Sequence, residues 1–67
     1  MENFNLNRER VEVTIDALKP GDVIYISNKD DATPYQVLDT GKPFILIENM
    51  KSHFANMYRP VHIYKDL

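Results

Sequence analysis

The chain has 67 residues and no cysteine, so it has room for one small domain and excludes both disulfides and thiolate metal sites. A chain of this length buries only about 60% of the surface that its unfolded state exposes, and homodimerisation is one way to add stability to so small a core. Its formal net charge of −2 is too small to indicate a nucleic-acid binder from charge alone.

The charges are divided unevenly along the chain. Residues 1–40 carry four basic and eight acidic side chains, whereas residues 41–67 carry four basic and two acidic ones. Any surface that faces an anion is therefore expected in the C-terminal part. The longest apolar run, residues 44–47, is too short to span a membrane, and the first ten residues lack the apolar segment of a signal peptide. We expect a cytoplasmic protein without membrane contact.

Residues 1–10 are polar at their start and are predicted to form a flexible N-terminal arm. From Val11 the pattern has a period of two, because Val11, Val13 and Ile15 alternate with polar residues, and this predicts a half-buried strand. A helix over residues 8–18 is the alternative, which the β-branched run disfavours.

The segment LKPGD, residues 18–22, predicts a turn. Pro20 presets φ at the second turn position, and Gly21 can take the positive φ that the third position of a type II turn requires. A strand over residues 22–28 and a polar loop over residues 29–34 are expected to follow.

A hairpin is predicted from residues 35–39 and 44–49, joined by residues 40–43 with Gly41 as the permissive residue. The second strand, FILIEN, begins apolar on both faces. This is typical of a central strand or of a strand that a partner covers.

Residues 50–57 change period. Met50, Phe54 and Met57 lie at i, i+4 and i+7, which predicts about two turns of helix docked on the body. The last strand is predicted over residues 58–64, with Val61 and Ile63 facing the core and the Tyr58, His62 and Tyr64 side chains facing outward.

The segments VEVTIDALKPGDVIYI and VHIYKDL resemble those of SH3-like small barrels, and YQVLDTGKPFILIEN resembles the central hairpin of that fold. The resemblance implies a barrel and a habit of binding partners, and it assigns no residue a role. With the strand pattern, it predicts an all-β domain over residues 11–67. This would be a five-stranded SH3-like barrel or a strongly bent meander, with one short helical turn near residues 50–57.

Catalysis and metal binding are not supported by any motif. The two histidines, His53 and His62, are nine residues apart without the spacing of a zinc site, and neither serine lies in a nucleophile elbow. We therefore expect no enzyme activity, no metal and no cofactor.

Aromatic, methionine and basic residues gather in the C-terminal part and predict a partner-binding surface, made of Met50, Lys51, Phe54, Met57, Tyr58, Arg59, His62, Tyr64 and Lys65. A protein partner is the first hypothesis, since Tyr and Arg are enriched at interface centres. A nucleic acid held by stacking and positive charge is the second, and a homodimer is the third. Tyr residues are also ordinary members of small sheets, where they stabilise pairs of strands.

Overall fold

The computed structural model describes residues 9–67, which form six strands and one short 3-10 helix. The strands are β1 (Arg10–Val13), β2 (Val23–Ile24), β3 (Tyr35–Gly41), β4 (Phe44–Asn49), β5 (Ala55–Tyr58) and β6 (Ile63–Asp66), and the 3-10 helix is Ile15–Ala17. The all-β prediction is thus confirmed. The predicted arm lies for its first eight residues outside the described part, and β1 begins at Arg10.

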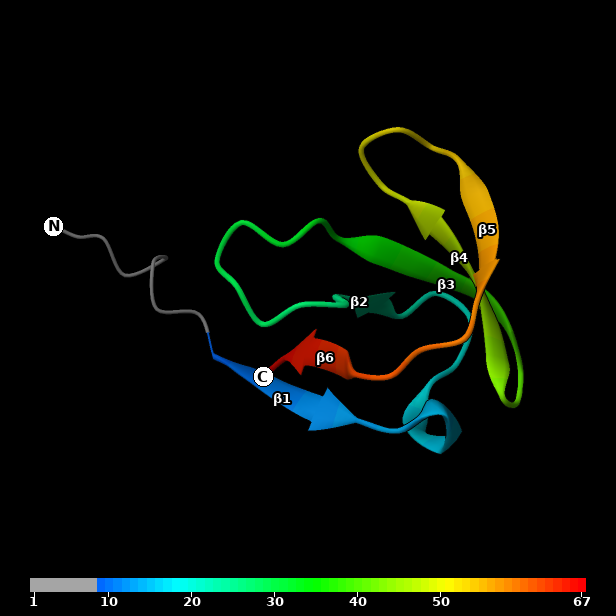
Figure 1. Ribbon diagram of the computed structural model, residues 1–67, viewed down its shortest axis with the longest axis horizontal. Helices are drawn as coiled ribbons and strands as arrows, with labels where there is room; N and C mark the ends of the chain where they lie inside the picture. The colour runs from blue at the N-terminus through cyan, green and yellow to red at the C-terminus, as the bar shows by residue number, and fades with distance from the viewer. Residues whose placement is uncertain (1–8) are drawn as a thin grey trace, which may run out of the picture.

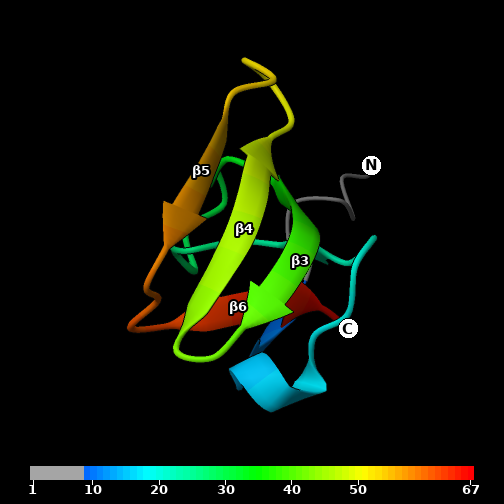
Figure 2. The same cartoon turned by 90° about the vertical axis from the view of Figure 1, so that its right-hand side faces the viewer.

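Within residues 9–67 the strands make two antiparallel sheets, β1-β6 and β2-β3-β4-β5. Figure 1 shows β1 and β6 together below β2 and β3, and Figure 2 shows that β6 crosses behind β3 and β4. An isolated bridge between Tyr25 and Tyr64 joins the two sheets, with hydrogen bonds of 2.8 and 2.9 Å between their backbone groups. No described strand pairs β1 with β5, so the sheets do not close into a barrel.

The core lies between the two sheets and is aliphatic. Its buried members come from the LKPGD segment and from β2, β3, β4 and β6: Leu18, Ile24, Val37, Ile45, Ile47 and Ile63. Burying each such side chain fully contributes about 1.5–3 kcal/mol. Strand pairing explains why these residues face inward, because Val37 lies opposite Ile47 and Thr40 opposite Ile45 across the β3–β4 ladder.

The first predicted strand is shorter than its pattern suggested. β1 ends at Val13, and the chain turns through the 3-10 helix, with N–H groups of Ala17 and Leu18 donating to the carbonyls of Thr14 and Ile15. This turn places the Leu18 side chain in the core, whereas Val11 is exposed. The alternating apolar residues Val11, Val13 and Ile15 therefore belong to two elements, β1 and the 3-10 helix.

The predicted helical turn over residues 50–57 is wrong. The Asn49 side chain accepts hydrogen bonds from the backbone N–H groups of Lys51 and Ser52, which closes a tight turn, and Ala55–Tyr58 then pairs with β4 as β5. Two turns of helix are marginal by themselves, and pairing along the ladder satisfies the backbone of this segment and of β4 together.

The predicted strand over residues 58–64 is also wrong in its bounds. β5 ends at Tyr58 and β6 begins at Ile63. Pro60 has no N–H to give to a ladder, so the chain leaves one sheet and enters the other around it. Ile63 is buried as predicted, but Val61, predicted to face the core, is 82% exposed.

The LKPGD turn is as predicted. Gly21 has φ of +99°, the N–H of Asp22 donates to the carbonyl of Lys19 at 3.1 Å, and the N–H of Gly21 donates to the carbonyl of Val37 at 2.8 Å. The turn thus extends the β2–β3 pairing. Gly41, by contrast, does not have a positive φ, and the Lys42–Pro43 peptide bond beside it is cis.

The two glycines provide a matched test of this turn. We expect Gly21→Ala to lower the free energy of unfolding by about 1 kcal/mol or more, because a Cβ is strained at positive φ. Gly41→Ala should change it by less than about 0.5 kcal/mol, because no atom lies within 4 Å of the added Cβ and the backbone is ordinary there. Urea unfolding of both variants measures the difference, and equal losses would contradict the turn geometry.

Candidate functional site

The predicted partner-binding surface is divided among several elements. Met50 and Lys51 lie in the β4–β5 turn, Phe54 and Met57 lie before and within β5, and Tyr58 ends that strand. Arg59 and His62 belong to the link between the sheets, whereas Tyr64 and Lys65 lie in β6. The structure therefore does not bring the nine residues together as one surface.

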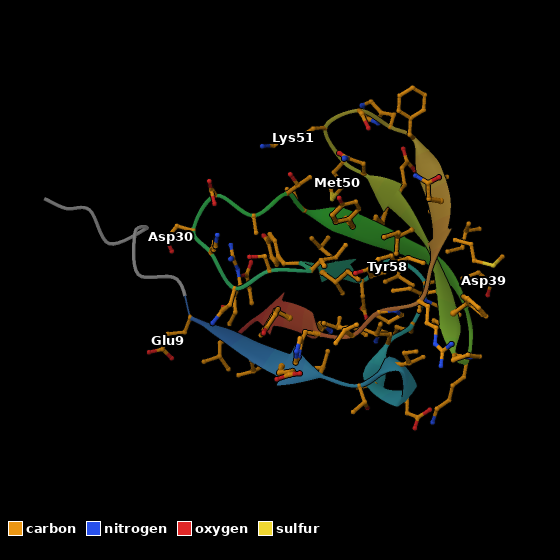
Figure 3. All side chains as sticks on the ribbon, viewed as in Figure 1. Glu9, Asp30, Asp39, Met50, Lys51 and Tyr58 are labelled. Carbon is orange, nitrogen blue, oxygen red and sulfur yellow. The ribbon has the colours of Figure 1, made fainter. Side chains whose placement is uncertain are left out.

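Tyr58 faces the core rather than the outside, against the prediction. It lies opposite Ile45 in the β4–β5 ladder and packs against the buried cluster. Figure 3 shows it on the inner side of the sheet, between β4 and β6. Tyr58 is thus a structural residue, and the expected outward row of Tyr58, His62 and Tyr64 is not formed.

His62 and Tyr64 do lie together, on the β1-β6 sheet. Their rings stack with centroids 6.2 Å apart, and Nδ1 of His62 is 2.6 Å from a carboxylate oxygen of Glu12. Both members of this His–Glu pair are more than half exposed. The pair joins the link before β6 to β1, which gives His62 a place in the fold.

The turn between β4 and β5 is well ordered by its own hydrogen bonds. The Asn49 side chain accepts the backbone N–H groups of Lys51 and Ser52. Its backbone N–H donates to the carbonyl of Phe54 at 2.9 Å, and its own carbonyl accepts the N–H of His53 at 2.7 Å. His53 takes a positive φ of 67°, and its Nδ1 is 3.2 Å from Glu48. The turn holds Phe54 with 73% of its surface exposed.

An apolar surface that the prediction missed covers the outer face of the four-stranded sheet. Because residues paired across a ladder share a face, Leu46 lies in one row with Asp39 of β3 and Met57 of β5. Phe44 lies beside this row, opposite Gly41. We call Asp39, Phe44, Leu46 and Met57 the outer surface. In Figure 2 the β3-β4-β5 sheet is seen from the side away from β6, and no ribbon crosses that face.

The outer surface contains a shallow open groove of about 190 Å³, lined by Asp39, Thr40, Gly41, Phe44, Ile45, Leu46 and Met57. Met57 is 70% exposed, and Phe44 is also exposed. Of this surface, only Met57 is among the predicted binding residues; the other sequence signal was the FILI run, whose apolar residues on both faces predicted a central strand or a covered one. β4 is indeed central, between β3 and β5.

The acidic side chains of the outer face differ in their partners. Glu48 is paired with His53. Asp39 accepts the N–H of the adjacent Thr40 at 2.9 Å and has no ionic partner within residues 9–67. Figure 3 shows Asp39 on the outer side of the sheet, with Met50 and Lys51 on the turn away from it. The groove thus combines apolar walls with one free carboxylate.

Lys65, a predicted binding residue, is already engaged. Its Nζ is 3.3 Å from a carboxylate oxygen of Asp22, which also accepts the backbone N–H of Lys19 at 3.0 Å. The Lys19 hydrogen bond is the main cause that lowers the pKa of Asp22 below its ordinary value; partial burial opposes this, and Lys65 adds to it. The Lys65–Asp22 ion pair therefore connects β6 to the LKPGD turn.

No three His, Asp or Glu side chains of residues 9–67 gather closely enough to hold a metal ion. In the same residues, no helix has the length and apolarity that crossing a membrane requires. His53 and His62 each pair with a different glutamate, in different elements.

Comparison with known proteins gave no significant match: no protein-family model, no curated protein and no solved structure matches the chain significantly.

The carboxylate of Asp22 provides a pH test. Because the pKa of this carboxyl is lower in the folded chain than its ordinary value of 3.8, the stability it contributes is present above that value and is lost as pH falls through the folded pKa. In an NMR titration of the Asp22 carboxyl carbon, we expect a midpoint below 3.8. Lys65→Met should raise the midpoint only in part, because the Lys19 hydrogen bond remains.

Lys42→Met is the matched control for that titration. Lys42 pairs with the exposed Asp16, so its loss should leave the Asp22 midpoint unchanged. An Asp22 midpoint at or above the ordinary value, or an equal response to both lysine variants, would contradict the arrangement.

Proposed function

We propose that this chain is a non-catalytic protein-binding module and that its partner docks on the outer surface, Asp39, Phe44, Leu46 and Met57. The row of Asp39, Leu46 and Met57 across three strands carries the proposal, because it places a free carboxylate beside apolar side chains on one open face. A small sheet that keeps Phe, Leu and Met at its outer face has a surface suited to burial against another protein.

Hydrophobic burial would supply most of the binding free energy. Met57 and Phe44 flank the groove, and both can repack around an inserted side chain, since Met in particular adapts to varied shapes. Removal of their exposed apolar area from water contributes about 25 cal/mol for each Å². Such a patch needs few polar contacts to hold a partner, but its specificity depends on them.

Asp39 defines the chemistry of the partner. Its carboxylate lines the groove and lacks an ionic partner within residues 9–67. The best complement is an apolar side chain that enters the groove with a lysine or arginine beside it. The partner is thus a protein segment that carries apolar and basic residues close together, and its binding should weaken moderately with salt.

The SH3-like resemblance is consistent with this proposal at the level of fold. Two antiparallel sheets packed around an aliphatic core are compatible with a small barrel-like domain. We propose that the chain is an open variant of that architecture. We also propose that the partner binding implied by the resemblance takes place on the outer surface.

A nucleic-acid partner has less support. Of the residues expected to form a stacking platform, Tyr58 packs against the core and Lys65 is paired with Asp22. Arg59 and Lys51 lie at opposite ends of β5. The outer surface itself presents a carboxylate, which repels phosphate.

Peptides selected from a displayed random library against the whole chain test the proposed function. We expect selected peptides that combine apolar residues with Lys or Arg, and amide shifts of the labelled protein at Leu46 and Met57 on titration. Met57→Asp should weaken the selected peptide about tenfold or more, equivalent to about 1.4 kcal/mol. Asp39→Asn should weaken it less and should reduce the salt dependence.

Val61→Asp is the control. Val61 is exposed and apolar like Met57, but it lies in the link between the sheets, away from the outer surface. Equal losses from both aspartate variants, selected peptides without basic residues, or shifts confined to β1 and β6 would refute the proposed function.

A further inference from the structure

β5 has one unpaired edge. It pairs with β4 on one side, and no other strand of residues 9–67 lies against its other side. The N–H of Asn49 donates to the carbonyl of Phe54, so alternation along the ladder directs the backbone groups of Asn56 and Tyr58 toward β4. The N–H and C=O groups of Ala55 and Met57 therefore point to the free edge.

This edge lacks the usual protection against another strand. Natural edge strands carry charged residues, proline or bulges that prevent edge-to-edge pairing. Among the edge strands of residues 9–67, β1 contains Arg10 and Glu12, and β2 and β6 are joined by the Tyr25–Tyr64 bridge, whereas β5 reads Ala-Asn-Met-Tyr without charge or proline. β5 is thus the edge of this fold best suited to accept a strand.

We propose that the β5 edge joins a second copy of this chain in an antiparallel pair around a two-fold axis at Asn56. Ala55 and Met57 are the residues with outward backbone groups, and they are symmetric about Asn56. In this register Ala55 of each copy exchanges hydrogen bonds with Met57 of the other, and the two Asn56 residues face each other as a non-hydrogen-bonded pair.

One observation and two consequences of this register favour a second copy over an unrelated strand. An uncharged strand can meet itself without repulsion between like charges. The register places the long Met57 opposite the small Ala55, so the side chains on the outer face fit together. It also places Phe54, 73% exposed in the single copy, opposite Tyr58 of the second copy.

The pairing involves the backbone edge, whereas the proposed function involves the outer surface, so each can fail without the other. Within the pair the two outer surfaces become continuous across the axis, since β5 and β5 of the second copy are neighbours in one sheet. The side chain of Asn56 makes no hydrogen bond within residues 9–67 and is free to pair with its counterpart.

Cysteine cross-linking tests the register directly, because the chain has no cysteine of its own. The Cα atoms of a non-hydrogen-bonded antiparallel pair are about 4.5 Å apart, within the range of a disulfide. Asn56→Cys should therefore form a covalent dimer about tenfold faster than Ala55→Cys under mild oxidation. Ala55 is also exposed, but it faces Met57 of the second copy rather than itself.

Sedimentation velocity provides the second readout. The wild-type mass should rise with concentration from 7.8 kDa toward twice that value. Met57→Pro removes an outward N–H without touching the ladder to β4 and should remain monomeric, whereas Met57→Ala keeps the N–H and should still pair.

Equal cross-linking of both cysteine variants, or a wild-type mass that stays monomeric at about 1 mM, far above the Kd of a stable complex, would overturn the proposal. Amides of Ala55 and Met57 that become protected only when a selected peptide is added would assign the edge to a foreign strand and would also overturn it.

Discussion

The junction between Tyr25 and Tyr64 is the constraint on which the fold depends, because it is the strand pairing that joins the two sheets within residues 9–67. Arg10 stabilises this junction through contacts with Tyr25, Asp66 and Lys29. The guanidinium lies 3.8 Å from the centre of the Tyr25 ring, its Nε is 3.2 Å from Asp66, and its Nη1 donates to the carbonyl of Lys29 at 2.6 Å. Only 7% of the Arg10 side chain is exposed. Its cation–π contact with Tyr25 is therefore stronger than the same contact would be on an open surface.

Joining the sheets on one side leaves the other side open. β5 keeps a free edge, and the outer surface of β3, β4 and β5 is not covered by any described element (Figure 2). In a closed barrel β5 would have a second neighbour, and its edge would be unable to accept another strand. The open side therefore accounts for the free edge proposed to join a second copy, whereas the outer surface proposed to bind a partner protein is a face of the sheet.

The elements that sequence reasoning predicted well are those determined by local chemistry. Pro20 and Gly21 required a turn, and the turn has the expected positive φ. The apolar run of β4 predicted a central strand or one that a partner covers, and β4 is central with Ile45 and Ile47 in the core. These features depend on one or two residues and their immediate neighbours, so the sequence alone determines them.

The failures lie in the C-terminal part, where tertiary pairing decides the outcome. The Met50, Phe54 and Met57 spacing fits a helix, but Asn49 closes a turn and β4 offers an unpaired edge, so the segment becomes a strand. Pro60 divides the next segment, so Tyr58 belongs to β5, where it lies opposite Ile45 and faces the core, and Val61 lies in the exposed link. The outer surface was missed because its members come from three strands, and only their register places Asp39, Leu46 and Met57 in one row.

Amide hydrogen exchange of the dilute chain tests most directly the claim that the sheets are joined on one side and open on the other. We predict slow exchange at Tyr25 and Tyr64, whose N–H groups bond to each other's carbonyls, and at Asn56 and Tyr58, which face β4. Ala55 and Met57, whose N–H groups face the free edge, should exchange rapidly. Protection of Ala55 and Met57 at dilution, or rapid exchange at Tyr25 and Tyr64, would contradict the account.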